Sequence, residues 1–153
     1  MKLPAILLAA AAVLAFSQEA NPWAKSEVVE PAALAAQIRS GKAPVVISVA
    51  FPVLYRSRHI VHAINAGPGF KPEGIALLKN AVAKLPKNAD IVVYCGCCPM
   101  DRCPNIRPAY QTLKAMGFTH IRVLDIPTNM HDDWYTKNYP SEPGSAGGSA
   151  SQD

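Results

Sequence analysis

Apolar and polar positions follow two different periods along this chain. Short β-branched runs, typical of buried strands, stand between longer segments whose apolar residues recur at helical spacing. The expected strands are residues 44–50, 63–65, 90–94 and 120–124. The expected helices are residues 30–39, 53–58, 72–85 and 129–137, and a segment that begins at Pro104 or Pro108 and ends near Met116. Strands that alternate with helices predict an α/β fold with a parallel sheet covered on both faces.

Both ends of the chain depart from this pattern. Lys2 precedes an uncharged apolar run over residues 3–16, which is shorter than the ~20 residues that a membrane-crossing helix needs. The run predicts a secretory signal peptide over residues 1–17, and hence a periplasmic or secreted protein without stable membrane association after cleavage. Residues 141–153 are rich in Gly and Ser and predict a disordered tail, which leaves one folded domain over residues 22–140.

Charge narrows the range of partners. The chain has 153 residues, a formal net charge of +4 and 17% charged residues. It has no block of Lys and Arg that would follow a nucleic-acid backbone, so we expect no nucleic-acid partner. The mild positive charge leaves small anions as candidate ligands.

The cysteines are concentrated in one short stretch. They are Cys95, Cys97, Cys98 and Cys103. A stabilising disulfide framework would spread cysteines over the fold to close long loops, so this cluster favours local chemistry, metal binding or a local disulfide. Four cysteines allow three pairings, and the sequence does not choose among them.

The position of Cys95 indicates a reactive site. It follows the strand expected over residues 90–94 directly and precedes a helix, and sites in parallel sheets form at the carboxyl ends of strands. A helix N-terminus lowers the pKa of a nearby thiol. We expect Arg102 and Arg107 to act on Cys95 in the same direction, and backbone N–H groups of the loop to hold an anion.

Three stretches of the chain resemble the rhodanese-like domain family, over about residues 23–140. RHIVHAIN (residues 58–65) resembles the family's GHIPGAIN motif, and IVVYC, which ends at Cys95, resembles the strand that delivers the family's nucleophile. The helix that ends at Gly117-Phe118, the following HIRVL, and then Trp134 and Tyr139-Pro140 resemble the family's C-terminal third. The resemblance implies a rhodanese-like α/β fold with a five-stranded parallel sheet flanked by helices on both faces.

The resemblance also implies an activity. Rhodaneses take a sulfane sulfur from a small anionic donor such as thiosulfate, carry it as a cysteine persulfide and pass it to a thiophilic acceptor such as a thiol, without a cofactor. It implies that Cys95 is the catalytic nucleophile and that Arg102 assists it. The expected substrate-binding loop comprises Gly96, Cys97, Cys98, Met100, Asp101, Cys103 and Arg107.

The chain departs from the family pattern at several positions, which leaves other functions open. Ser48 stands where the family usually has Asp, Arg58 replaces the first Gly of the motif, and the active loop is longer. The spacing from Cys97 to Arg102 matches the family's shorter loop, which would make Cys97 the nucleophile in place of Cys95. One alternative function is a thiol–disulfide or arsenate-type reductase that uses Cys95 and Cys98. The other is a non-catalytic module that binds a metal or a partner.

Overall fold

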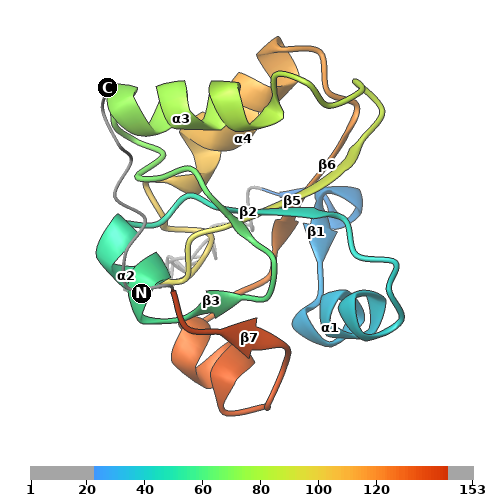
Figure 1. The fold of residues 1–153 in the computed structure, drawn as a ribbon, viewed down its shortest axis with the longest axis vertical. Coiled ribbons are helices and arrows are strands. Elements are labelled where there is room, and N and C mark those ends of the chain that lie inside the picture. The colour runs from blue at the N-terminus through green and yellow to red at the C-terminus, as the bar shows by residue number, and fades with distance from the viewer. Residues whose placement is uncertain (1–22, 145–153) are drawn as a thin grey trace, which may run out of the picture.

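A five-stranded parallel sheet forms the centre of the protein. The structure, a computed structural model, describes residues 23–144 and is drawn in Figure 1. The strand order is β1-β6-β5-β2-β4, and every pairing is parallel. The strands are β1 (Val28–Val29), β2 (Val45–Ser48), β4 (Ile64–Asn65), β5 (Asp90–Tyr94) and β6 (His120–Leu124). The predicted parallel sheet is confirmed, and β5 and β6 have the predicted bounds.

The middle strand β5 is buried on both faces. Its side chains Ile91, Val92 and Val93 are all 0% exposed. A continuous β-branched run is what a strand covered from both sides requires, because alternate side chains point to opposite faces. In this sheet β5 lies between β6 and β2. The position of Cys95, which follows Tyr94, is therefore set by the middle strand of the sheet.

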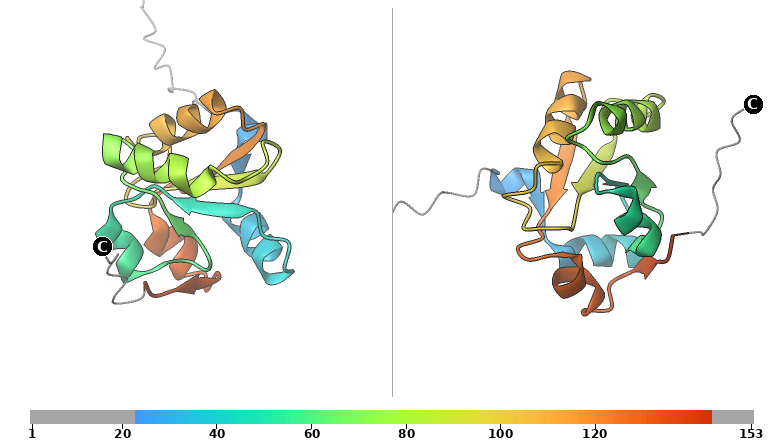
Figure 2. Two further views of the ribbon diagram at one scale, coloured as in Figure 1. Left: turned by 45° about the horizontal axis from the view of Figure 1, so that its top comes forward. Right: turned by 90° about the vertical axis from the view of Figure 1, so that its left-hand side faces the viewer.

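Helices cover both faces of the sheet. Figure 1 shows α3 and α4 side by side on one face, and α1 with the helical turn of residues 131–135 on the other; Figure 2 shows the same layers from other sides. The helices are α1 (Pro31–Arg39), α2 (Pro52–Ser57), α3 (Pro72–Val82) and α4 (Ile106–Ala115), preceded by the 3-10 turn η1 (Lys25–Glu27). The last predicted helix is a shorter π-helical turn, η2 (His131–Tyr135). Within residues 23–144 no helix has the length and apolar character to span a membrane.

Helix α4 begins at neither of the two candidate prolines. Its N-cap is Asn105, and Ile106 is its first residue. The Asn105 side chain is fully buried, where its Oδ1 accepts a hydrogen bond from the Phe70 N–H (3.2 Å) and its Nδ2 donates to the Cys95 sulfur (3.3 Å). These tertiary contacts set the start of the helix. Pro108 lies in the first turn, where its missing N–H is not needed.

A second, two-stranded sheet contradicts one predicted boundary. Strand β3 (His59–Ile60) pairs antiparallel with β7 (Ser141–Glu142), so the folded part continues beyond residue 140. Gly144 also donates its N–H to the Arg56 carbonyl oxygen at 3.1 Å. The Gly- and Ser-rich composition gave no sign of this pairing, because the strand is held by contacts with residues far away in the chain. The predicted signal peptide, and residues 145–153 of the predicted tail, lie outside the described residues.

Candidate active site

A cavity of about 290 Å³ opens at the carboxyl ends of β2 and β5. Cys95 comes directly after β5, is 3% exposed and lines this cavity together with Cys97. Other residues in the wall are Ser48, Tyr55, Arg58, Tyr94, Gly96, Met130, His131 and Tyr135. The predicted nucleophile therefore lies where the fold class places its sites.

Three of the four cysteine sulfur atoms form a close cluster. The Sγ atoms of Cys95, Cys97 and Cys103 all lie within 4.8 Å of one another. The Sγ of Cys97 is 3.2 Å from that of Cys95 and 3.2 Å from that of Cys98. Cys98 is not one of these three mutually close residues and does not line the cavity, but its side chain interacts with that of Cys103. Three neighbouring thiols are also a donor set that can hold a soft, thiophilic cation.

The pKa values of the Cys95 and Cys103 thiols are shifted in opposite directions. A hydrogen bond from the Cys95 thiol, together with the backbone N–H groups of Asn105 and Ile106 at the start of α4, lowers the pKa of the Cys103 thiol to about 6. The same hydrogen bond, together with burial, raises the pKa of Cys95. These opposite directions favour a thiolate on Cys103 over one on Cys95.

This charge distribution corrects a prediction from the sequence. We expected the N-terminus of the helix to lower the pKa of Cys95. Instead the helix acts on Cys103, because α4 begins three residues after Cys103, and the N–H groups of its N-cap and first residue donate to that sulfur.

The two arginines expected near Cys95 lie elsewhere. The Arg102 side chain is 83% exposed, and its Nε is 3.9 Å from a carboxylate oxygen of the neighbouring Asp101. The Arg107 guanidinium lies over the Trp23 ring, 5.0 Å from its centroid. Neither arginine lines the cavity. Met100 and Cys103 are buried, with 3% and 6% of their surface exposed. Asp101 and Arg102, which lie between them, are exposed to solvent.

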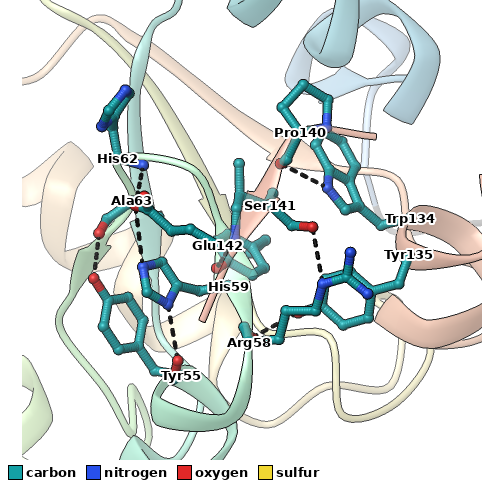
Figure 3. A network of polar contacts seen from close by, with 12 residues as sticks. Tyr55, Arg58, His59, His62, Ala63, Trp134, Tyr135, Pro140, Ser141 and Glu142 are labelled. Carbon is teal, nitrogen blue, oxygen red and sulfur yellow. Dashed lines mark hydrogen bonds and ion pairs between the residues drawn. The ribbon is translucent and has the colours of Figure 1, made fainter. Parts of the chain in front are cut away.

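Arg58 places a positive charge at the cavity, which Arg102 and Arg107 do not. It lines the cavity, and its Nε donates to the Ser141 hydroxyl at 2.9 Å. Its guanidinium lies 4.5 Å from the centroid of the Tyr135 ring, and the Tyr135 hydroxyl donates to the Arg58 carbonyl oxygen at 2.7 Å. Figure 3 shows these contacts. The available signal was the replacement of the family's motif glycine by a basic residue.

The wall of the cavity beside α2 is held by aromatic and backbone contacts (Figure 3). The rings of Tyr55 and His59 stack with their centroids 3.8 Å apart, and His59 Nδ1 donates to the Tyr55 carbonyl oxygen at 2.9 Å. His59 Nε2 is 3.4 Å from the Glu142 carboxylate, and the Tyr55 hydroxyl donates to the Ala63 carbonyl oxygen at 2.6 Å. His59 is 5% exposed, and these contacts give it a structural role.

The floor of the cavity is neutral where the family usually has a carboxylate. Ser48, at the end of β2, is 1% exposed, and it interacts with the Tyr94 hydroxyl. That hydroxyl also accepts the Ile60 N–H at 3.2 Å, and burial raises the pKa of Tyr94. Among the described residues that line the cavity none is acidic, whereas Arg58 and His131 are basic. The cavity therefore suits an anion.

Gly96 sets the course of the chain between the two cavity cysteines. Its φ is +83°, a conformation that residues with a side chain rarely adopt. A Cβ on Gly96 would collide with the Met130 side chain, and the Gly96 carbonyl oxygen accepts the Met130 N–H at 3.0 Å. This close approach joins the cysteine loop to the segment that carries His131.

These features define a class of protein, an α/β protein with a buried thiol at the end of the central strand and an anion-compatible cavity beside it. Comparisons with known proteins agree with this class. The family model for the rhodanese-like domain matches residues 30–126. This chain belongs to the rhodanese-like domain family. A search of the curated proteins finds no match.

Solved structures confirm the fold. The BH2092 protein from Bacillus halodurans is similar with a TM-score of 0.61 and 24% identity, covering 77% of this chain and 77% of that one. The rhodanese-like domain of the Alr3790 protein from Anabaena sp. has a TM-score of 0.56 and 21% identity, covering 83% of this chain and 88% of that one. At these identities the likeness extends to the fold, and the chemistry has to be argued from the residues of the site.

Proposed function

We propose that this protein transfers a sulfane sulfur through a persulfide on Cys95. One observation carries the proposal: the Cys95 thiol lies at the end of β5 in a cavity that is lined by Arg58 and, among the residues the structure describes, by no acidic side chain. Membership of the rhodanese-like domain family and the cysteine-rich cluster support a sulfurtransferase type of module. The donor is a small anion such as thiosulfate, and the acceptor is a thiol.

The first step uses the interaction between the side chains of Cys95 and Cys103. Cys95 transfers its proton to the Cys103 thiolate and attacks the outer sulfur of thiosulfate. A Cys95 sulfur–sulfur bond forms, the sulfur–sulfur bond of thiosulfate breaks, and sulfite leaves with the bonding electron pair. Arg58, fixed by Ser141 and Tyr135, stabilises the anionic donor in the cavity. The persulfide then awaits an acceptor.

The positions of the cysteines bear on the alternative function, a reductase. A reductase that pairs Cys95 with Cys98 is less favoured, because Cys98 lies outside the cluster that contains Cys95. The partner sulfur atoms within 4.8 Å are those of Cys97 and Cys103. Export to the periplasm or out of the cell is part of this proposal, and it rests on the sequence pattern of residues 1–17.

Intact mass spectrometry tests the proposal. The reduced full chain is measured before and after thiosulfate is added under anaerobic, reductant-free conditions, together with Cys95→Ser and Cys97→Ser. We expect a sulfur to be taken up by the wild type and by Cys97→Ser, seen as a gain of about 32 Da or as sulfide released later, and not by Cys95→Ser. Sulfur uptake by Cys95→Ser together with none by Cys97→Ser would move the nucleophile to Cys97.

A further inference from the structure

Cys103 has a place in the site that sulfur carriage on Cys95 alone does not explain. The proposed first step needs only a base beside Cys95, whereas a buried thiol beside a persulfide can also react with it. We propose that Cys103 attacks the Cys95 persulfide, releases its outer sulfur as hydrosulfide and leaves a disulfide between Cys95 and Cys103. This inference rests on the proposed persulfide and adds an activity to it, the reductive release of sulfide.

The positions of the two sulfur atoms favour this reaction. The Sγ of Cys103 is within 4.8 Å of the Sγ of Cys95 and interacts with it directly. Cys95 lines the cavity, whereas Cys103 does not. A sulfur carried on Cys95 therefore extends into the cavity, and Cys103 approaches the Cys95 sulfur from outside it. Displacement at sulfur needs this separation of the attacking and leaving groups.

The charge of Cys103 also suits an attacking group. Its sulfur accepts the N–H groups of Asn105 and Ile106, and the first turn of the ten-residue helix α4 places a positive partial charge there. The lowered pKa makes the thiolate available at neutral pH. Cys103 is 6% exposed, which shields it from external disulfides and leaves Cys95 as its nearest electrophile.

The step balances in atoms and electrons. The Cys103 thiol gives up the proton that it accepted earlier and the terminal sulfur of the persulfide takes up a proton, both by exchange with solvent, which restores the Cys103 thiolate. That thiolate forms a bond to the Cys95 sulfur, the Cys95–sulfur bond to the outer atom breaks, and hydrosulfide leaves with the electron pair. The two cysteines are oxidised to a disulfide, and the sulfane sulfur is reduced to sulfide. A second turnover requires an external thiol or dithiol as reductant.

The other two cysteines are less well placed for this role. The sulfur of Cys98 lies outside the cluster. A disulfide between Cys95 and Cys97 would have to span Gly96 alone, whose φ of +83° and hydrogen bond to Met130 fix the local backbone. Cys103 comes from a separate part of the loop and meets no such restriction.

The test is a single turnover of the full chain, fully reduced, anaerobic and free of added thiol. Thiosulfate is added, released sulfide is measured, and intact mass and a peptide map follow. For the wild type we expect about one sulfide per chain, a loss of about 2 Da and a Cys95–Cys103 disulfide. A sample without thiosulfate controls for oxidation. Cys98→Ser is expected to form the same disulfide.

Cys103→Ser distinguishes this inference from the proposed function. Because Cys103 also takes the Cys95 proton in the proposed first step, we expect the variant to gain about 32 Da more slowly than the wild type turns over, and to release sulfide only after an external thiol is added. Loss of the Cys103 sulfur also removes the hydrogen bond that is the main cause of the raised Cys95 pKa, so we expect that pKa to fall. Sulfide release at the wild-type rate from Cys103→Ser, or a wild-type disulfide that maps to Cys97, overturns the role of Cys103.

Failure of the proposed function has a different signature. It would show as neither a mass gain nor sulfide in both the wild type and Cys103→Ser, and this outcome overturns both ideas together. Circular dichroism and the thermal midpoint of Cys103→Ser and Cys103→Ala establish that each variant is folded. The peptide map of the wild type decides the pairing without any variant.

Discussion

The Arg58 guanidinium lies over the Tyr135 ring, 4.5 Å from its centroid, although the two residues are 77 positions apart in the chain. The Tyr135 hydroxyl donates a hydrogen bond to the Arg58 carbonyl oxygen, and the Ser141 hydroxyl accepts one from Arg58 Nε. The side chain and the backbone of Arg58 are therefore both anchored. An anchored arginine can bind an anion with little further loss of side-chain entropy.

Replacement of Arg58 is expected to weaken donor binding. In Arg58→Gln the cavity loses its guanidinium, and a charge-assisted hydrogen bond is worth about 1.5–3 kcal/mol, which corresponds to a rise of about tenfold or more in the KM for thiosulfate. Steady-state kinetics with a thiol acceptor measure the change. Arg102→Gln is made in parallel, because the sequence favoured Arg102 while the structure places its side chain in solvent. A larger KM effect from Arg102 would contradict this assignment.

The rate of persulfide formation should fall on the acid side of neutrality. The pKa of Cys103 is lowered to about 6, so the thiolate that takes the Cys95 proton is present above that pH and is lost as the pH falls through it. Below the pKa we expect about a tenfold lower rate for each pH unit. Single-turnover rates of sulfur uptake from pH 5 to 9 measure the profile. An inflection near the value of an ordinary cysteine would show that Cys103 does not supply the thiolate.

Gly96→Ala should destabilise the protein more than Gly117→Ala does. Both glycines have positive φ, +83° and +87°, so both alanines carry about 1–2 kcal/mol of backbone strain. A Cβ at Gly96 also collides with Met130, whereas at Gly117 it meets only the Lys87 side chain at 4.0 Å. The collision adds about 1–3 kcal/mol. Urea denaturation measures both free energies of unfolding, and equal losses would mean that the contact with Met130 relaxes freely.

Asp133 should matter far more than Asp132. The Asp133 Oδ2 accepts the N–H groups of Thr128 (2.7 Å) and Asn129 (3.0 Å), and the residue is 7% exposed. Asp133→Ala leaves both donors without this acceptor, at about 2–3 kcal/mol in the free energy of unfolding. Asp132 is exposed, so Asp132→Ala is expected to cost less than about 0.5 kcal/mol. Urea denaturation compares the two, and similar losses would contradict the anchoring role of Asp133.

The sequence predicted the parts of the fold that depend on local patterns. The buried run of β5 and the strand β6 have the predicted bounds, because β-branched runs of this length indicate a buried strand whatever surrounds them. The start of α4 could not be predicted, because the Asn105 side chain is held by Phe70 and Cys95 from elsewhere in the fold. Strand β7 could not be predicted either, since its partner is β3.

The same distinction, between local patterns and contacts with distant residues, applies to the candidate site. The sequence located Cys95, because a strand delivers it directly. It chose Arg102 by spacing along the loop, whereas the arginine in the cavity, Arg58, is brought there by Tyr135 and Ser141. The sequence also predicted that the N-terminus of the helix lowers the pKa of Cys95. Only the folded loop shows that Cys103 is the residue beside the first N–H groups of α4.

The pairing of β3 with β7 has a consequence for the order of events during synthesis. Arg58 and Ser141 are 83 residues apart, so the cavity wall cannot close until nearly the whole described chain has left the ribosome. The cysteine loop and the strands β2, β4 and β5 are made earlier, and domains begin to fold from the N-terminus. An incomplete chain can thus hold a partly built sheet with its thiols still exposed. The thiols are enclosed only when β7 is present and pairs with β3.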